Sequence, residues 1–157
     1  MKGTTTDLYS EILKNLFLGG TDDEDTVLNI ERNRNPFITK KDFDTVVTAY
    51  AWANPASWGV KEIRTTFFDG DMSDINWADL YQAVEIAYTD WRNGSRLLLR
   101  CQMGANRSGL LMSLLLRKHG YTSKDAIALL REKRGSWVLC NPVFETYLLN
   151  LDAEKTD

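Results

Sequence analysis

The sequence predicts an α/β fold in which a mainly parallel central sheet is flanked by helices on both faces. The first observation is that short apolar runs of strand length alternate along the chain with longer segments of helical spacing, an order typical of parallel sheets covered on both faces. The second is size and composition. With 157 residues, of which 43% are hydrophobic, residues 1–157 are expected to form a single domain around one core.

The N-terminal half predicts four strands. Short ones are expected around residues 12–13 and 16–18, and longer ones at 43–49 and 63–68. A polar stretch from Thr21 to Asp25 is either a solvated helix start or a loop. The loop of residues 50–58 follows the third strand and is expected to border the same cleft as the site below, with its tryptophans as packing residues.

The C-terminal half predicts one strand and four helices from the spacing of apolar residues. In residues 77–91 apolar side chains recur every three or four positions, the pattern of a helix with one face on the sheet. The expected strand is 97–99, and the expected helices are 77–91, 110–116, 122–134 and 144–151. The charged run 131–134 is interpreted as a solvated helix end.

The expected strand at 97–99 and helix at 110–116 are joined by the segment CQMGANRSG, residues 101–109. Cys101 and Arg107 stand six positions apart, Gly104 lies between them, and Ser108 follows directly. A helix N-terminus offers unpaired backbone N–H groups and the positive end of the helix dipole, and both favour an anion. The spacing therefore predicts a phosphate-binding loop.

Each side chain of this loop suits phosphoryl chemistry. A thiolate is the nucleophilic form of cysteine, and a helix N-terminus with a nearby cation favours it, so Cys101 is the expected nucleophile. The planar fork of Arg107 matches two phosphoryl oxygens. Gly104 can turn the loop amides toward one centre, and Ser108 can donate a hydrogen bond to a departing thiolate.

The loop resembles the CxxGxxR[S/T] signature of the cysteine-dependent protein phosphatases, specifically the dual-specificity group. Residues 10–19 are similar to the opening strand pair of that family, and residues 141–144, NPVF, to its closing segment. The resemblance implies a protein-tyrosine-phosphatase-like fold and hydrolysis of phosphotyrosine, and of phosphoserine and phosphothreonine, through a phosphocysteine intermediate without metal or cofactor. The expected phosphate-binding residues are Gln102, Met103, Gly104, Ala105, Asn106 and Arg107.

The family takes a general acid from an aspartate about thirty residues before the cysteine, because expelling an alkoxide without a proton is slow. Alignment with the family pattern selects Asp69. A shift of one turn in this glycine-containing loop would present Asp71 instead, so Asp71 is the alternative acid. Asp74 is expected to cap the following helix. Loops after parallel strands open at one edge, which would bring Asp69 and Cys101 together.

Three further residues leave alternatives open. Arg100 stands where the family has histidine. It either favours the thiolate by its charge or points away from the loop and pairs with a carboxylate. Asn141 either helps to position the hydrolytic water, as the resemblance implies, or caps the last helix. Cys140 is interpreted as a small buried hydrophobe rather than as a resolving cysteine for Cys101.

Charge and composition narrow the expected partners and location. A net charge of −3 argues against nucleic acid, and the loop lacks the lysines of phosphatases that act on inositol lipids. A phosphorylated protein or small phosphoester is expected, with phosphate, sulfate or vanadate able to occupy the loop. No apolar run has membrane-spanning length, residues 1–6 lack the centre of a signal peptide, and two cysteines form no disulfide framework. A cytoplasmic location is therefore expected.

Two alternatives to a protein phosphatase stay open. Residues 106–109, NRSG, resemble the NRTG variant of the RNA 5′-phosphatase branch of the superfamily, although Met103 replaces the histidine of that branch. The other alternative is a catalytically weak, phosphate-binding pseudophosphatase. The short chain leaves little room for insertions that deepen a cleft, so a shallow cleft that admits all three phosphorylated residues is expected.

Overall fold

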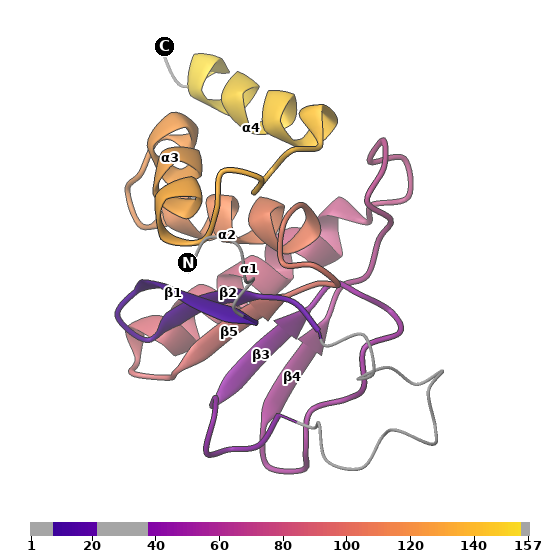
Figure 1. Cartoon of the computed structure of the whole chain (residues 1–157), viewed down its shortest axis with the longest axis vertical. Coiled ribbons are helices and arrows are strands. Elements are labelled where there is room, and N and C mark those ends of the chain that lie inside the picture. Colours follow the sequence, from indigo (N-terminus) through magenta and orange to yellow (C-terminus); the bar gives the residue numbers. More distant parts are fainter. Residues whose placement is uncertain (1–7, 22–37, 155–157) are drawn as a thin grey trace.

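The computed structural model describes residues 8–21 and 38–154, and its elements follow the expected alternation (Figure 1). The described strands are β1 (Tyr9–Leu13), β2 (Leu16–Gly19), β3 (Thr45–Thr48), β4 (Lys61–Arg64) and β5 (Leu97–Arg100). The described helices are α1 (Trp77–Arg92), α2 (Arg107–Lys118), α3 (Ser123–Lys133) and α4 (Pro142–Glu154). The predicted α/β fold is confirmed. The polar stretch after Thr21 lies outside the described residues.

The sheet has the strand order β1-β2-β5-β3-β4. Strand β1 runs antiparallel to β2, and all other neighbours are parallel, so the sheet is mixed but mostly parallel. Strand β5 is central, and Arg100 at its carboxyl end lies between Gly19 of β2 and Thr48 of β3. The loop that follows β5 therefore leaves the middle of the sheet at the edge where ligands bind in open α/β folds.

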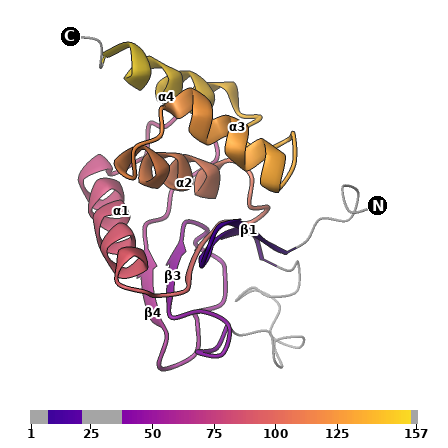
Figure 2. The ribbon, with the colours of Figure 1, turned by 90° about the vertical axis from the view of Figure 1, so that its left-hand side faces the viewer.

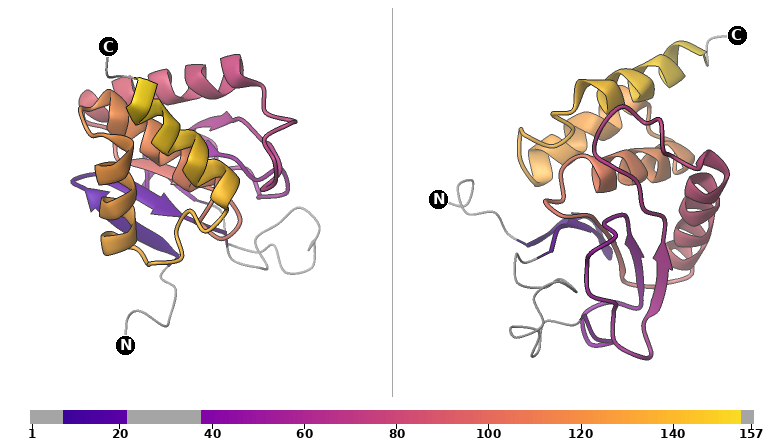
Figure 3. Two further views of the ribbon diagram at one scale, coloured as in Figure 1. Left: turned by 90° about the horizontal axis from the view of Figure 1, so that it is seen from above. Right: turned by 90° about the vertical axis from the view of Figure 1, so that its right-hand side faces the viewer.

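The described helices all pack on one face of the sheet (Figure 2). Leu97 and Leu99 of β5 belong to the large core shared with the helices. Leu98 points to the opposite face, as strand alternation requires, where the irregular segments that carry Ile38 and Phe43 cover it. Helix α4 lies over α2 and α3, with α2 between it and the sheet (Figure 3). The sequence led us to expect helices on both faces; in the described part of the chain, irregular segments cover the second one.

Two local expectations were wrong in their boundaries. Strand β4 was expected at 63–68, but it ends at Arg64, because only Lys61–Arg64 pair with β3 and the chain then turns away toward the loop. Asp74 does not cap α1. Asn76 holds the cap position and accepts a hydrogen bond from the amide of Asp79 at 3.1 Å. No helix among the described residues is long and apolar enough to cross a membrane.

Candidate active site

The loop between β5 and α2 surrounds a cavity of about 160 Å³. Cys101 lies at its base with only 2% of its surface exposed. The Sγ atom of Cys101 lies 3.2 Å from Oγ of the fully buried Ser108, which is hydrogen-bond distance for this pair. Arg107 and Asp69 line the same cavity. The structure therefore brings together the four residues that the sequence proposed for the reaction.

Four consecutive carbonyl groups of this loop are held by donors outside it. The pairs are Gln102 with the amide of Thr21 at 2.9 Å, Met103 and Gly104 with the guanidinium of Arg134 at 3.0 and 2.9 Å, and Ala105 with the amide of Leu139 at 3.1 Å. In a trans peptide the C=O and N–H groups point in opposite directions. Anchoring these carbonyls on the outside therefore turns the next four amides, residues 103–106, toward the inside of the loop.

These amides have no hydrogen-bond partner among the described residues. Over residues 8–21 and 38–154, no backbone N–H of residues 102–107 donates a hydrogen bond. Asn106 occupies the N-cap of α2, yet its side chain does not cap the helix. The Nε atom of Arg107 is buried and also donates to no described group. A ring of unpaired donors at a helix N-terminus favours an anion with several acceptor oxygens.

Gly104 is required by two features of this loop. Its φ of +74° is one that side chains rarely adopt. A Cβ atom there would lie 2.6 Å from the carbonyl carbon of Gly19 and 2.7 Å from its oxygen, so the backbone itself would have to move. The glycine lets the loop turn its amides inward while it packs against the end of β2.

Sequence reasoning missed Arg134. The run 131–134 was interpreted as a solvated helix end, and this is wrong for both of its arginines. Arg134 binds two loop carbonyls as above and donates to Oγ of Ser10 at 2.9 Å. Arg131 donates to the carbonyls of Val138 and Leu139 at 2.8 and 3.1 Å. No local pattern distinguishes such arginines from solvated ones, since the acceptors of Arg134 come from distant segments and those of Arg131 depend on how the chain turns after the helix.

The two candidate acids lie in different environments. Asp69 lines the cavity and accepts from Nδ2 of Asn106 at 2.9 Å and from Nδ2 of Asn141 at 2.8 Å. Asp71 is exposed and does not line this cavity. Hydrogen bonds from the side chain and amide of Ser73 hold the pKa of Asp71 below its usual value. A lowered pKa makes a poorer proton donor near neutral pH.

Asn141 makes the contact of a helix cap, one of its two alternatives, and it also binds the candidate acid. Its Oδ1 atom accepts from the amide of Val143 at 2.9 Å in the first turn of α4, and its Nδ2 atom donates to Asp69 and to the carbonyl of Gly70 at 3.0 Å. Its own amide donates to Oδ1 of Asn106 at 2.9 Å. The start of α4, the phosphate-binding loop of residues 101–109 and the acid loop, which is the segment with Asp69 between β4 and α1, are thus connected through amide side chains.

Arg100 points away from the loop and pairs with a carboxylate, the second of the two alternatives for it. It is 1% exposed. It donates to Oγ1 of Thr48 at 2.9 Å, to the carbonyl of Asn54 at 2.7 Å and to Glu62 at 3.2 Å. Burial alone would raise the pKa of Glu62, but hydrogen bonds from Thr48 and the Ala56 amide and the charges of Arg64 and Arg100 hold that pKa below its usual value.

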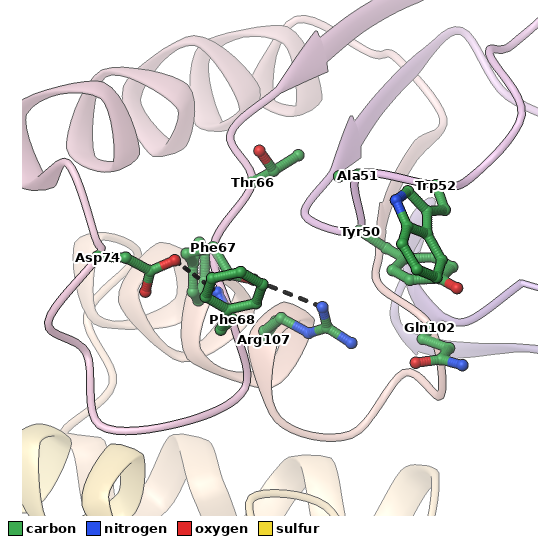
Figure 4. A pocket seen from close by; sticks show the side chains of 9 residues that line it. All are labelled: Tyr50, Ala51, Trp52, Thr66, Phe67, Phe68, Asp74, Gln102 and Arg107. Carbon is green, nitrogen blue, oxygen red and sulfur yellow. Dashed lines mark hydrogen bonds between the residues drawn. The ribbon is translucent and has the colours of Figure 1, made fainter.

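Two other expectations were wrong. Cys140 is not buried: it is exposed and lines the small cavity together with Cys101. The tryptophans of the 50–58 loop are not packing residues, since Trp58 is fully exposed and Trp52 is 53% exposed. Trp52 lines a second, larger cavity of about 530 Å³ beside Arg107 (Figure 4). The backbone carbonyls of Ala51, Ala53 and Asn54 in this loop instead accept hydrogen bonds from Arg64 and Arg100.

Within residues 8–21 and 38–154, no three histidine, cysteine, aspartate or glutamate side chains gather where they could share an ion. The donors that face the cavity are N–H groups, which bind anions rather than cations.

No family model matches the chain. It is 24% identical over 126 residues to a protein of Invertebrate iridescent virus 6 named "Putative tyrosine phosphatase 123R", a match covering 80% of this chain and 79% of the viral protein. Human DUSP28 has a similar structure, with a TM-score of 0.73 at 20% identity over 96% of this chain and 97% of that one. The structure of DUSP15 is also similar, with a TM-score of 0.71 at 16% identity over 92% of this chain and 86% of that one. The resemblance to the dual-specificity phosphatases that the sequence suggested is thus confirmed, and the chain has the fold of that family.

Proposed function

We propose that this protein is a metal-independent phosphatase that removes phosphate from phosphotyrosine, and from phosphoserine and phosphothreonine, in proteins. The observation that carries the proposal is the inward-facing set of amides of residues 103–106, which have no partner among the described residues, around a cavity with Cys101 at its base. The orphaned Nε of Arg107 adds a charged donor at the same place. A phosphoryl group supplies the acceptor oxygens and the negative charge that these donors require.

In the first step, the thiolate of Cys101 attacks phosphorus. An S–P bond forms as the ester P–O bond breaks, and Asp69 gives its proton to the leaving oxygen. The loop amides and Arg107 hold the three non-bridging oxygens and stabilise the charge that spreads over them in the transition state. A carboxyl oxygen has more than one lone-pair direction, so the contacts of Asp69 with Asn106 and Asn141 leave room for the substrate oxygen.

In the second step, water attacks the phosphocysteine. Asp69, now ionised, takes a proton from that water while the S–P bond breaks, and inorganic phosphate leaves. Ser108 donates a hydrogen bond to the released thiolate from its position 3.2 Å from Sγ. Asn141 acts through Asp69, because it donates to a carboxylate oxygen at 2.8 Å and so orients the base toward the water.

The pseudophosphatase alternative shares the phosphate site but has no turnover, so activity separates the two. The RNA 5′-phosphatase alternative gains no support among the described residues, since the exposed side chain of Met103 stands where that branch has histidine. Phosphotyrosine, phosphoserine and phosphothreonine peptides of one sequence, assayed side by side, test the proposed substrate range.

The deciding experiment is hydrolysis of para-nitrophenyl phosphate in the presence of EDTA. The wild type is expected to turn over, and Cys101→Ser is expected to lose about 10⁴-fold or more in kcat, as loss of an essential nucleophile does. Cys140→Ser controls for removal of a thiol beside the same cavity. An inactive wild type that still binds vanadate would establish the pseudophosphatase. Activity abolished by EDTA would overturn the metal-free mechanism.

A further inference from the structure

The larger cavity beside the phosphate loop is lined mainly by aromatic and other apolar groups. Tyr50 and Trp52 form one wall, and Phe67 and Phe68 lie opposite them with Arg107 between (Figure 4). Phe68 is 75% exposed and Trp52 is 53% exposed. Large aromatic side chains left open to water across a cleft are typical of surfaces that bury something apolar.

This cleft is continuous with the phosphate site. Gln102 and Arg107 line both cavities. The guanidinium carbon of Arg107 lies 5.3 Å from the centre of the Tyr50 ring, and its Nη1 atom lies 3.4 Å from the carbonyl oxygen of Phe67. A phosphoryl group held by Arg107 would therefore place the rest of its substrate next to the aromatic walls. At about 530 Å³ the cleft is far larger than that group needs.

One wall of the cleft is preformed. Arg64 donates to the carbonyls of Ala51 and Ala53 at 3.3 and 2.7 Å, and the buried Arg100 donates to the carbonyl of Asn54 at 2.7 Å. Two arginines, at the carboxyl ends of β4 and β5 on either side of β3, thus hold the loop that carries Trp52. A wall that is already ordered loses less conformational entropy when it binds a partner.

Charge favours an apolar occupant over a second anionic group. The carboxylate of Asp74 also lines this cleft and accepts a hydrogen bond from the amide of Phe68 at 3.0 Å. A second phosphate, as in a nucleic acid or a multiply phosphorylated lipid headgroup, would lie beside this negative charge and would be repelled by it.

We propose that this cleft is a specificity subsite for a bulky apolar side chain within two residues of the phosphorylated residue in a protein substrate. The proposal rests on the phosphatase function above. An extended peptide advances about 3.3 Å per residue, so a side chain that near the phosphorylated residue reaches the adjoining cavity. Trp52 and Phe68 are the residues that determine the preference.

The test uses pairs of phosphotyrosine peptides that differ in one residue, which is leucine in one peptide and serine in the other. In one pair this residue stands two positions before the phosphotyrosine, and in a second pair it stands two positions after it. Wild type is expected to show a kcat/KM about tenfold higher for the leucine peptide of at least one pair, as burial of one apolar group gives. Trp52→Ala and Phe68→Ala are each expected to bring this ratio toward one. Trp58→Ala is the matched control, because Trp58 is fully exposed and lines neither cavity, and it is expected to keep the wild-type ratio.

The outcomes separate the two proposals. Failure of the wild type to hydrolyse para-nitrophenyl phosphate would overturn the phosphatase function itself. Turnover of the two peptides of each pair at equal kcat/KM, or a ratio unchanged in both Trp52→Ala and Phe68→Ala, would overturn the subsite alone. Since the ratio is internal to each variant, partial loss of folded protein does not alter it. Faster turnover of a short-chain phosphoinositide than of the leucine peptide would assign the cleft to lipid and reject the peptide proposal.

Discussion

At the scale of single residues, two aspartates that are near neighbours in sequence differ through their hydrogen-bond partners. Asp69 faces the cavity of Cys101 and is bound by the side-chain amides of Asn106 and Asn141. Asp71 instead accepts from Ser73 within its own exposed turn. The contacts of Asp69 cross from the acid loop to α2 and α4, whereas those of Asp71 stay local. Only the first arrangement ties a carboxyl group to the phosphate site.

Asp69→Ala is expected to lower kcat for a phosphotyrosine peptide by about 10²–10⁴-fold, the usual contribution of a positioned general acid. It should also remove the basic limb of the pH–rate profile, since that limb reports loss of the acid's proton. Asp71→Ala, which removes an equal charge two residues away, is expected to keep the wild-type kcat and the basic limb of the profile. The measurement is kcat and kcat/KM between pH 4.5 and 8. If only Asp71→Ala lost the basic limb, the assignment of Asp69 would be wrong.

At the scale of elements, the phosphate loop is shaped by the end of a helix that follows it in sequence. Arg134, at the C-cap of α3, binds the carbonyls of Met103 and Gly104. Its side chain also stacks over Trp137, with the guanidinium carbon 5.2 Å from the ring centre. Helix α3 thereby keeps two loop carbonyls outside and their neighbouring amides inside, although Arg134 lines neither cavity.

Arg134→Met is expected to weaken vanadate inhibition about tenfold, because two of the four anchored carbonyls lose their donor and the amides are no longer held inward. Lys133→Met is the matched control, since it removes the same charge from the adjacent, exposed position. Inhibition constants at constant ionic strength provide the measurement. Equal weakening by the two variants would show that Arg134 acts only through its long-range charge.

At the scale of the whole molecule, a buried ionic network joins three strands. Glu62 of β4 accepts from Thr48 of β3 at 2.6 Å and from Arg100 of β5 at 3.2 Å. The same carboxylate accepts from the amide of Ala56 in the connecting loop at 3.0 Å. Because Arg100 is almost completely buried, loss of the Glu62 charge would remove a counter-ion from a cation in the interior, and breaking one partner of a buried pair is strongly destabilising.

Glu62→Gln is expected to lower the free energy of unfolding at pH 7 by about 3 kcal/mol, or roughly 6–12 °C in Tm. The pKa of Glu62 is lowered in the folded state from an ordinary value of 4.5. Its stabilisation is therefore complete above that value and is lost as the pH falls through the lower folded pKa. The difference between wild type and variant should thus shrink below pH 4.5.

Thermal unfolding from pH 3 to 7 measures this effect. Glu85→Gln serves as the control, since Glu85 pairs with Lys118 on the surface and is 60% exposed, and surface pairs contribute little. A difference between wild type and Glu62→Gln that stayed constant down to pH 3 would contradict the role of the Glu62 charge.

Nine contiguous residues explain why so much was predictable from the sequence. Residues 101–109 contain the proposed nucleophile together with the arginine, the glycine and the hydroxyl, and the apolar runs on either side predict the strand and helix that enclose them. Local periodicity also predicted α1 and α4 closely, because apolar spacing is a property of the segment itself. The phosphate-binding loop followed from such local patterns, whereas Asp69 as the candidate acid followed from the family resemblance carried by this loop and by residues 10–19 and 141–144.

Only the tertiary structure decided which distant side chains meet at the site. Arg134 on the loop carbonyls, Asn141 on Asp69 and Glu62 on Arg100 are pairs separated by 30 to 72 positions. The exposure of Cys140 and Trp52, and the cleft that Trp52 lines, also depend on segments far apart in the chain. The physical reason is that apolar spacing specifies an element and its buried face, whereas a polar contact depends on how the elements pack. The sequence alone therefore does not distinguish a solvated arginine from one that binds the loop carbonyls at the site.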